Sequence, residues 1–141
     1  MALKVLIADD SAFMRSIVKN VLTQAGVTDI TEAVDGQDAI IKYDQINPNL
    51  CFFDIMMPNK TGLEALKEIM EKHPDAKIVM CTSVGQEKVV QEAVETGATD
   101  FITKPFKPED IKEVVSKFNK WILKRRAILW SKWVVLLYNF V

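Results

Sequence analysis

The fold is decided by residues 50–58, which read Leu50-Cys51-Phe52-Phe53-Asp54-Ile55-Met56-Met57-Pro58. Four apolar residues lead directly into the carboxylate of Asp54, and Pro58 interrupts the chain soon afterwards. A short continuous apolar run that ends near a turn residue is typical of a strand buried on both faces. The stretch therefore predicts a buried strand with an acidic side chain at its carboxyl end.

Four more short apolar runs read as strands, and longer amphipathic stretches separate all five. The runs are Leu3 to Ala8, Asp29 to Ala33, Lys77 to Cys81 and Thr99 to Thr103. Between them, apolar residues recur at helical spacing. Phe13, Ile17, Val21 and Leu22 do so in the stretch Ala12 to Gln24, and Leu63, Leu66, Ile69 and Met70 do so further on.

Glycines mark the ends of two of these helical stretches. Gly26 and Gly97 each stand where a left-handed helix cap is expected. The regular alternation of strand and helix predicts an α/β, doubly wound fold. Its parallel sheet would carry helices on both faces, because parallel strands need crossover connections.

Length and composition favour a single soluble domain. The chain has 141 residues, of which 49% are apolar, and its 18 basic groups nearly balance its 19 acidic groups. This balance gives no indication of nucleic-acid binding. Cys51 and Cys81 lie inside apolar runs without zinc-ligand spacing, so we expect buried free thiols in a reducing compartment. The amino-terminal end does not have the features of an export signal, and we expect a cytoplasmic location.

Polar residues follow the ends of four predicted strands. They are Asp9-Asp10, Asp54, Thr82-Ser83 and Lys104-Pro105. Doubly wound sheets bind ligands beyond the carboxyl ends of their strands, so we expect these residues to lie together. Three converging carboxylates repel one another unless a cation lies among them. Oxygen ligands without His or Cys favour Mg²⁺, with Asp10 and Asp54 as direct ligands.

Each of these residues has a simpler explanation when taken alone. Asp9 and Asp10 could begin a helix, Asp54 could be a turn residue, and Lys104 could be a solvated lysine. Their joint placement instead suits phosphoryl transfer. The Lys104 ammonium would supply positive charge, and the Thr82 hydroxyl could donate to a phosphoryl oxygen.

The motifs resemble the signature positions of response-regulator receiver domains, in the same order and at similar separations. They are Asp9-Asp10-Ser11, Asp54 to Pro58 with Gly62-Leu63-Glu64, Thr82-Ser83, and Lys104-Pro105-Phe106. The resemblance covers residues 1 to about 120. Residues 9–15 are similar to chemotaxis receivers, both stand-alone CheY types and the receiver halves of methylesterases. The resemblance implies a flavodoxin/CheY-like sheet of five strands in the order 2-1-3-4-5.

The resemblance also implies a role for each residue of the site. Asp54 would accept a phosphoryl group from a CheA-like histidine kinase. Asp9, Asp10, Asp54 and the backbone carbonyl of Met56 would bind Mg²⁺, and Thr82 and Lys104 would act as catalytic residues that hold the phosphoryl oxygens. In the family, the Lys104–Pro105 peptide bond is cis.

Signalling in the family couples Thr82 to an aromatic residue, here Phe101, where many members have tyrosine. Phe101 can also be interpreted as a core aromatic residue. The output face would combine a helix at Gln86 to Glu95, the fifth strand and a helix from Pro108, and a motor-switch or adaptor protein would bind it. No esterase or DNA-binding domain follows, so output is expected from the receiver's own surface. We interpret His73 and Arg15 as helix-surface residues, and Arg15 also as a candidate partner contact.

Three other functions are compatible with parts of this pattern. An acid-nucleophile phosphatase would need a second acid two residues after Asp54, where Met56 stands, and we therefore expect a switch rather than a turnover enzyme. A receiver fragment of a larger regulator, such as a methylesterase, is a further alternative. A nucleotide-binding domain would need a glycine-rich loop after the first strand, which the sequence lacks.

Residues 121–141 lie beyond the resemblance and form a hydrophobic extension to the expected receiver domain, residues 1–120. Lys124-Arg125-Arg126 precedes an apolar run, Ala127 to Val141, that is interrupted by Ser131, Lys132 and Asn139. Fifteen helical residues rise about 22 Å, short of the roughly 30 Å hydrocarbon core of a bilayer. We therefore expect self-association or membrane-surface contact, or an extension without function, rather than a membrane span.

Overall fold

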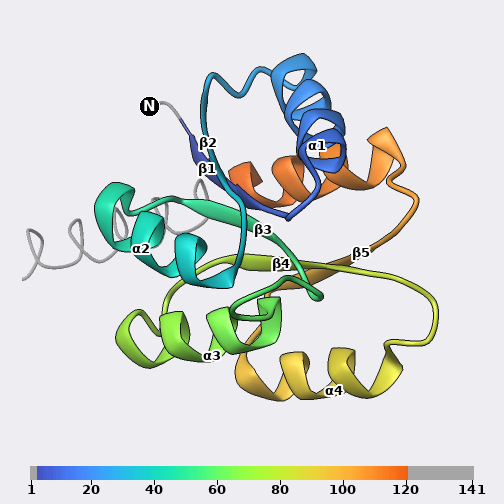
Figure 1. Cartoon of the computed structure of the whole chain (residues 1–141). Coiled ribbons are helices and arrows are strands. Elements are labelled where there is room, and N and C mark those ends of the chain that lie inside the picture. Colours follow the sequence, from blue (N-terminus) through green and yellow to red (C-terminus); the bar gives the residue numbers. More distant parts are fainter. Residues whose placement is uncertain (1–2, 121–141) are drawn as a thin grey trace, which may run out of the picture.

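The five predicted strands form one parallel sheet in the order β2-β1-β3-β4-β5 (Figure 1). The structure is a computed structural model that describes residues 3–120. The strands are β1 (Lys4–Ala8), β2 (Asp29–Ala33), β3 (Leu50–Asp54), β4 (Ile78–Thr82) and β5 (Asp100–Thr103). The doubly wound α/β class and the strand order expected from the resemblance are therefore confirmed.

Helices connect successive strands and cover both faces of the sheet. They are α1 (Ala12–Gln24), α2 (Gly36–Ile46), α3 (Gly62–Lys72) and α4 (Glu87–Thr96), followed by a helix over 108–120, the end of the described range. In Figure 1, α1 and the 108–120 helix lie on one side of the sheet, and α2, α3 and α4 lie on the other. The bounds predicted for α1 agree with the structure.

Alternate residues of each strand point to opposite faces, so the sheet has two cores. On the α2–α4 side, buried residues include Leu6, Phe53 and Met80. On the other side, Ile7 and Phe52 pack with residues of α1 and of the 108–120 helix. Because the central strands are covered on both faces, all five residues of β3 and of β4 are buried. This explains why the first four residues of each of these strands are apolar rather than alternating.

The predicted cysteine and glycine positions are confirmed. Cys51 and Cys81 are buried free thiols, and burial raises the pKa of Cys51 well above its usual value. Gly26 and Gly97 have φ values of 90° and 116°, in the left-handed region that glycine adopts most easily.

Phe13 lies in α1, as its spacing predicts, but its side chain is 73% exposed. Buried positions of α1 include Val18 and Leu22. Phe13 precedes Leu22 by nine residues, or about two and a half turns, and so lies on the opposite side of the helix. The sequence spacing showed an amphipathic helix, but Phe13 does not belong to its buried stripe.

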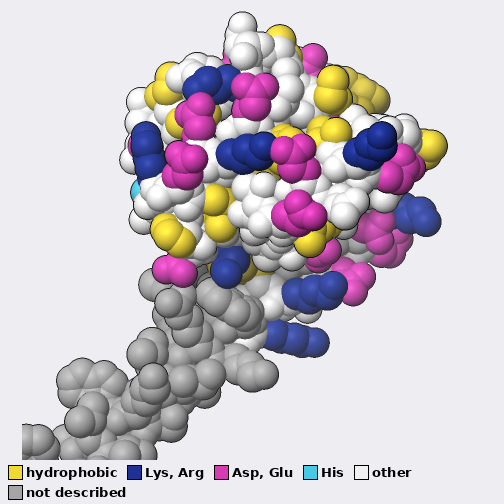
Figure 2. Space-filling model, turned by 90° about the horizontal axis from the view of Figure 1, so that it is seen from below, with side chains coloured by type: hydrophobic (Ala, Val, Ile, Leu, Met, Phe, Trp, Pro, Cys, Tyr) yellow, Lys and Arg dark blue, Asp and Glu magenta, His cyan; other side chains and the backbone are white. Residues whose placement is uncertain are grey.

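The α2–α4 side of the molecule carries charges of both signs. Figure 2, which views this side, shows Lys and Arg side chains interspersed with Asp and Glu. Two ion pairs join neighbouring elements here, Lys60 with Glu68 and Lys67 with Glu92. Within residues 3–120, none of the helices combines the length and apolar character needed to cross a membrane. The hydrophobic extension predicted at 121–141 lies outside the described residues.

Candidate functional site

Three carboxylates converge at the carboxyl edge of the sheet, as the sequence predicts. The parallel register pairs Ala8 of β1 with Phe53 of β3, so Asp9 and Asp54 both follow paired residues. Carboxylate oxygens of Asp9, Asp10 and Asp54 all lie within 4.8 Å of one another. Asp9 and Asp54 are buried, whereas Asp10 is exposed. Two carboxylates of the cluster are therefore buried, and the third, that of Asp10, faces solvent.

Lys104 bridges two of these acids from the end of β5. Its Nζ lies 3.3 Å from Oδ2 of Asp9 and 3.1 Å from Oδ2 of Asp54. The lysine side chain is only 19% exposed. Burial lowers the pKa of Lys104, but the charges of Asp54 and Asp9 outweigh burial, and the net pKa is raised. Lys104 is therefore a fixed cation in the site, and the peptide bond to Pro105 is cis, as expected.

Asp54 is held at the point where β3 enters the next loop. Burial raises the pKa of Asp54 and the charge of Asp9 raises it further, while the charge of Lys104 opposes both. The backbone amide of Met56 hydrogen-bonds to the carboxylate and lowers its pKa. The repulsion between Asp54 and Asp9 is therefore only partly relieved by Lys104.

The amino-terminal end of α3 lies directly against the backbone of Asp54. The amide of Gly62 donates to the carbonyl of Ile55 over 2.8 Å. A Cβ atom at position 62 would come within 2.0 Å of the Asp54 carbonyl oxygen, so only glycine fits this approach. Thr61 caps the helix and forms a capping box with Glu64. The contact at Gly62 joins main-chain groups, and side-chain patterns in the sequence did not reveal its structural importance.

Thr82 and Phe101 lie where the resemblance implies, on neighbouring strands. Thr82 is buried at the end of β4, and its carbonyl accepts a hydrogen bond from the Lys104 amide over 2.7 Å. Phe101 pairs in register with Met80 and is a partly buried member of the α2–α4 core. The core interpretation of Phe101 therefore has direct support, and its role in switching stays a prediction.

Exposed apolar side chains follow each acidic or hydroxyl residue of the site. Phe13 stands three residues after Asp10, Met56 is 59% exposed two residues after Asp54, and Val84 is 91% exposed after Thr82. The structure thus leaves Met56 and Val84 accessible beside the predicted phosphorylation site.

Arg15 and His73 are more constrained than the sequence suggested. The Arg15 side chain is only 13% exposed and pairs with Glu32 over 3.2 Å, so its interpretation as a helix-surface residue is wrong. A partner contact at Arg15 stays a prediction. His73 Nε2 lies 3.1 Å from Oδ1 of Asp44, and its ring lies 4.9 Å from that of Tyr43. Sequence spacing identified the helices of both residues but could not identify these tertiary contacts.

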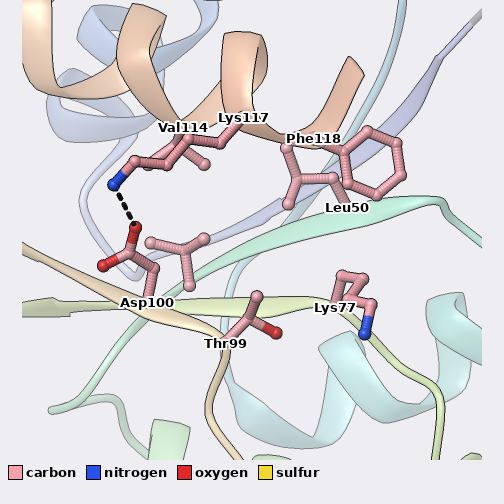
Figure 3. A pocket seen from close by; sticks show the side chains of 8 residues that line it. Leu50, Lys77, Thr99, Asp100, Val114, Lys117 and Phe118 are labelled. Carbon is pink, nitrogen blue, oxygen red and sulfur yellow. Dashed lines mark ion pairs between the residues drawn. The ribbon is translucent and has the colours of Figure 1, made fainter. Parts of the chain in front are cut away.

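A separate apolar cavity lies near the amino-terminal ends of the strands, opposite the acid cluster. It has a volume of about 180 Å³ and is lined by Leu50, Lys77, Val79, Thr99, Asp100, Val114, Lys117 and Phe118. Leu50 and Asp100 are the first residues of their strands. Figure 3 shows Lys117 reaching from the 108–120 helix toward Asp100, and the two are 3.7 Å apart. The cavity is therefore distinct from the acid cluster.

The donor set of the acid cluster fits a hard divalent cation. All three side chains offer carboxylate oxygens, and Mg²⁺ prefers oxygen ligands while keeping several waters. The exposure of Asp10 leaves room for water on one side. The pKa of Asp54 is raised first by burial and then by the charge of Asp9, and a cation would relieve the second of these effects. Receiver domains generally bind Mg²⁺ at an acidic pocket of this kind.

Comparison with known proteins agrees with this geometry. The model of the response regulator receiver domain family matches residues 5–116. The chemotaxis protein CheY of Thermotoga maritima is 44% identical over 120 residues, which are 85% of this chain and 100% of that protein. A protein-glutamate methylesterase/protein-glutamine glutaminase of the same organism is 42% identical over 73% of this chain, but only 30% of that protein is covered.

The fold comparison gives the same result. The crystal structure of the chemotaxis response regulator CheY4 of Vibrio cholerae superposes with a TM-score of 0.76 at 30% identity, covering 84% of this chain and 99% of the other. The family match spans both the sheet and all three acidic residues of the cluster. The chain therefore belongs to the response regulator receiver domain family and is similar to chemotaxis proteins of the CheY type.

Proposed function

We propose that this protein is a cytoplasmic single-domain response regulator of a chemotaxis system, phosphorylated on Asp54 by a histidine kinase in the presence of Mg²⁺. One observation carries the proposal: the Lys104 ammonium bridges Asp9 and Asp54 inside a cluster of three carboxylates. A nucleophilic carboxylate, a fixed cation and a cation-binding acid pair are the parts that phosphoryl transfer requires.

Asp54 is the nucleophile in this proposal. A carboxylate oxygen of Asp54 attacks the phosphorus of a phosphohistidine, the new P–O bond forms an acyl phosphate, and the P–N bond breaks. The imidazole leaves with the bonding electron pair. Lys104 pairs with one phosphoryl oxygen and the Thr82 hydroxyl donates to another. Bound Mg²⁺, held by Asp9, Asp10, Asp54 and the Met56 carbonyl, would neutralise negative charge on the reacting oxygens.

In this proposal, binding of a target protein depends on contacts of Thr82 with the phosphoryl group. Movement of Thr82 toward that group would leave space beside Phe101, which lies on the same face of the sheet and could repack against α4. The face formed by α4, β5 and the 108–120 helix would then bind a motor-switch or adaptor protein. Because Phe101 lacks a hydroxyl, we propose that a change in its packing, rather than a new hydrogen bond, alters the output face.

Intact-mass measurement tests the phosphorylation step. After incubation with acetyl phosphate and Mg²⁺, the protein should gain about 80 Da, the mass of one phosphoryl group. Asp54→Asn should abolish this gain because the amide cannot form an acyl phosphate. Asp38→Asn is a suitable control, since Asp38 is a partly buried carboxylate in the first turn of α2 that pairs with Lys42. A gain that persists in Asp54→Asn would move the site elsewhere.

Two alternatives remain testable. The identity to a methylesterase over 30% of its length favours a receiver portion of a larger regulator as the second candidate, and binding of an esterase domain rather than a motor-switch protein would support it. A phosphatase using Asp54 as nucleophile would release phosphate steadily from small phosphoesters. We expect a single phosphorylation per chain and no such turnover.

A further inference from the structure

Arg15 lies behind the acid cluster and reaches it through the main chain. Its guanidinium donates to the backbone carbonyl of Asp9 over 2.7 Å, and its Nε donates to Oε1 of Glu32 over 3.2 Å. Asp9 follows β1, Glu32 belongs to β2, and Arg15 belongs to α1. The partly buried guanidinium therefore ties three elements together at the edge of the site.

Glu32 is a firm anchor for this contact. A second cation near its carboxylate, Lys19, is 3.6 Å away and half-exposed, so that pair contributes little. The backbone carbonyl of Glu32 accepts a hydrogen bond from Nζ of Lys42, an α2 residue, over 2.6 Å. The main chain of Glu32 is held in β2 and by Lys42, so the Arg15 guanidinium that pairs with its carboxylate is placed relative to β2.

The carbonyl that Arg15 holds belongs to the peptide group between Asp9 and Asp10. The other polar groups of Asp9 are also engaged: its amide donates to the carbonyl of Ala33 over 3.2 Å, and its Oδ1 accepts from the Ser11 amide over 2.9 Å. The Asp10 side chain is exposed, so its direction depends on the orientation of the preceding peptide group. The hydrogen bond from Arg15 to the Asp9 carbonyl restrains that orientation.

We propose that Arg15 is a positioning residue for the divalent cation: it holds the Asp9–Asp10 peptide group against β2, so that both carboxylates face Asp54. The inference rests on the proposed function, in which the cation binds at these three acids. Partners of metal ligands commonly affect metal affinity by 10- to 100-fold although they do not touch the metal. Arg15 differs from the usual partner because it acts on a ligand's main chain.

The sign of the effect separates positioning from simple electrostatics. Removing a positive charge near three carboxylates should strengthen cation binding if charge alone matters. Loss of positioning should weaken cation binding instead. The two explanations therefore make opposite predictions for Arg15→Met, whose side chain retains apolar bulk without the charge or donors.

Titration calorimetry with MgCl₂ at constant temperature and ionic strength measures this effect. We expect Arg15→Met to weaken Mg²⁺ binding about 10-fold or more. Arg15→Lys should recover part of the affinity, because one ammonium cannot reproduce the two-partner geometry of the guanidinium. Lys19→Met is the matched control: Lys19 pairs with the same Glu32, and we expect its removal to leave Mg²⁺ affinity unchanged.

A second variant and a second measurement distinguish loss of positioning from general damage to the fold. Melting in EDTA shows whether each variant is folded, and Glu32→Gln weakens the anchor while keeping Arg15. We expect Glu32→Gln also to weaken Mg²⁺ binding, and we expect saturating Mg²⁺ to restore the rate of acetyl phosphate labelling in Arg15→Met. If folded Arg15 and Glu32 variants bind Mg²⁺ as tightly as the wild type, or if Lys19→Met loses as much affinity, the positioning role is wrong. If the wild type itself binds no Mg²⁺, the proposed function fails first.

Discussion

At the scale of single residues, Asp54 combines two demands that oppose each other. It must be ionised to act as a nucleophile, yet burial raises its pKa and the charge of Asp9 adds to this effect. Lys104, 3.1 Å away, favours the ionised form. The net pKa of Asp54 is raised, so the folded protein without metal binds a proton at this site more tightly than the unfolded chain does.

This raised pKa predicts a pH dependence of stability. A carboxyl group with a raised pKa in the folded state adds stability as pH falls through that pKa toward the unfolded value of 3.8, and this contribution is absent at higher pH. In EDTA, Asp54→Asn should therefore be more stable than the wild type at pH 7. The difference should shrink by pH 4.5. Denaturant melts at both pH values measure it, and a constant difference would contradict the assigned pKa direction.

Met56 and Val84 predict a long-lived phosphorylated state. Both are exposed and follow Asp54 and Thr82 by two residues, positions that the resemblance to receiver domains implies are beside the path of the hydrolytic water. Two apolar side chains offer no hydrogen bonds to order an attacking water. Met56→Asn should therefore increase the first-order rate of phosphate loss, measured by intact mass after removal of the donor.

Val94→Asn provides a matched control for this change. Val94 is 55% exposed, similar to Met56, but it lies on α4 away from the acid cluster. The same substitution there should leave the rate of phosphate loss unaltered. Equal rates for wild type and Met56→Asn would show that the side chain at 56 does not limit hydrolysis.

At the scale of elements, the amino-terminal end of α3 supports the phosphorylation site. Gly62 has no room for a Cβ atom because the Asp54 carbonyl would lie 2.0 Å away. Gly62→Ala must shift either α3 or the end of β3, and overpacking of this kind typically costs about 1–3 kcal/mol. We expect a loss of stability in that range together with slower phosphorylation of Asp54.

Thr61→Ala distinguishes damage to the helix from displacement of Asp54. It removes the hydroxyl that accepts from the Glu64 amide over 3.1 Å, and loss of such a cap costs about 1 kcal/mol. It adds no atom near Asp54, so the phosphorylation rate should stay near that of the wild type. If both variants slow phosphorylation equally, the close approach at Gly62 has no special role.

The elements also show what a single sequence can and cannot predict. The predicted bounds of α1 agree with the structure, in which Ser11 caps the helix and Gly26 adopts the left-handed conformation after it. Helix α2 was not assigned to particular residues, although Asp35 caps it. It ends at Asn47 in the left-handed conformation instead of at a glycine, and this weakened the usual signal.

The candidate site was predictable to the extent that strand ends determine it. Asp9, Asp54 and Lys104 meet because parallel strands bring their carboxyl ends to one edge. The contacts of Arg15 with Asp9 and of Gly62 with Asp54 could not be predicted in this way, because each involves a backbone carbonyl. Side-chain periodicity carries no information about which carbonyl a neighbouring element approaches.

At the scale of the whole molecule, cation binding should be coupled to folding. A cation that binds only the folded acid cluster stabilises the protein by mass action, and it also relieves repulsion that the unfolded chain does not experience. Millimolar Mg²⁺ should raise the melting temperature, and Asp10→Asn should reduce this increase. Asp29→Asn, which changes an exposed acid outside the cluster, should not. A melting temperature indifferent to Mg²⁺ would count against the cluster as a metal site.

The last prediction concerns residues 121–141, which lie outside the described residues and are apolar after Lys124-Arg125-Arg126. If this extension mediates self-association or contact with a membrane surface, ending the chain at Lys120 should remove that property. Phosphorylation should persist, because every residue of the proposed site lies within the 5–116 match to the receiver family. Size-exclusion chromatography tests self-association.

The composition of the extension provides a direct probe of membrane contact. All three tryptophans of the chain, Trp121, Trp130 and Trp133, belong to it, so intrinsic tryptophan fluorescence reports on the extension alone. Insertion of indole rings at a bilayer interface should shift their emission to shorter wavelength when vesicles containing anionic lipid are added, since the basic cluster would be attracted to them. Neutral vesicles should produce a smaller shift. A 141-residue chain that elutes as a monomer and shows no spectral change with either vesicle would exclude both functions, because an apolar extension that acts through association must bury its tryptophans against another chain or a lipid surface.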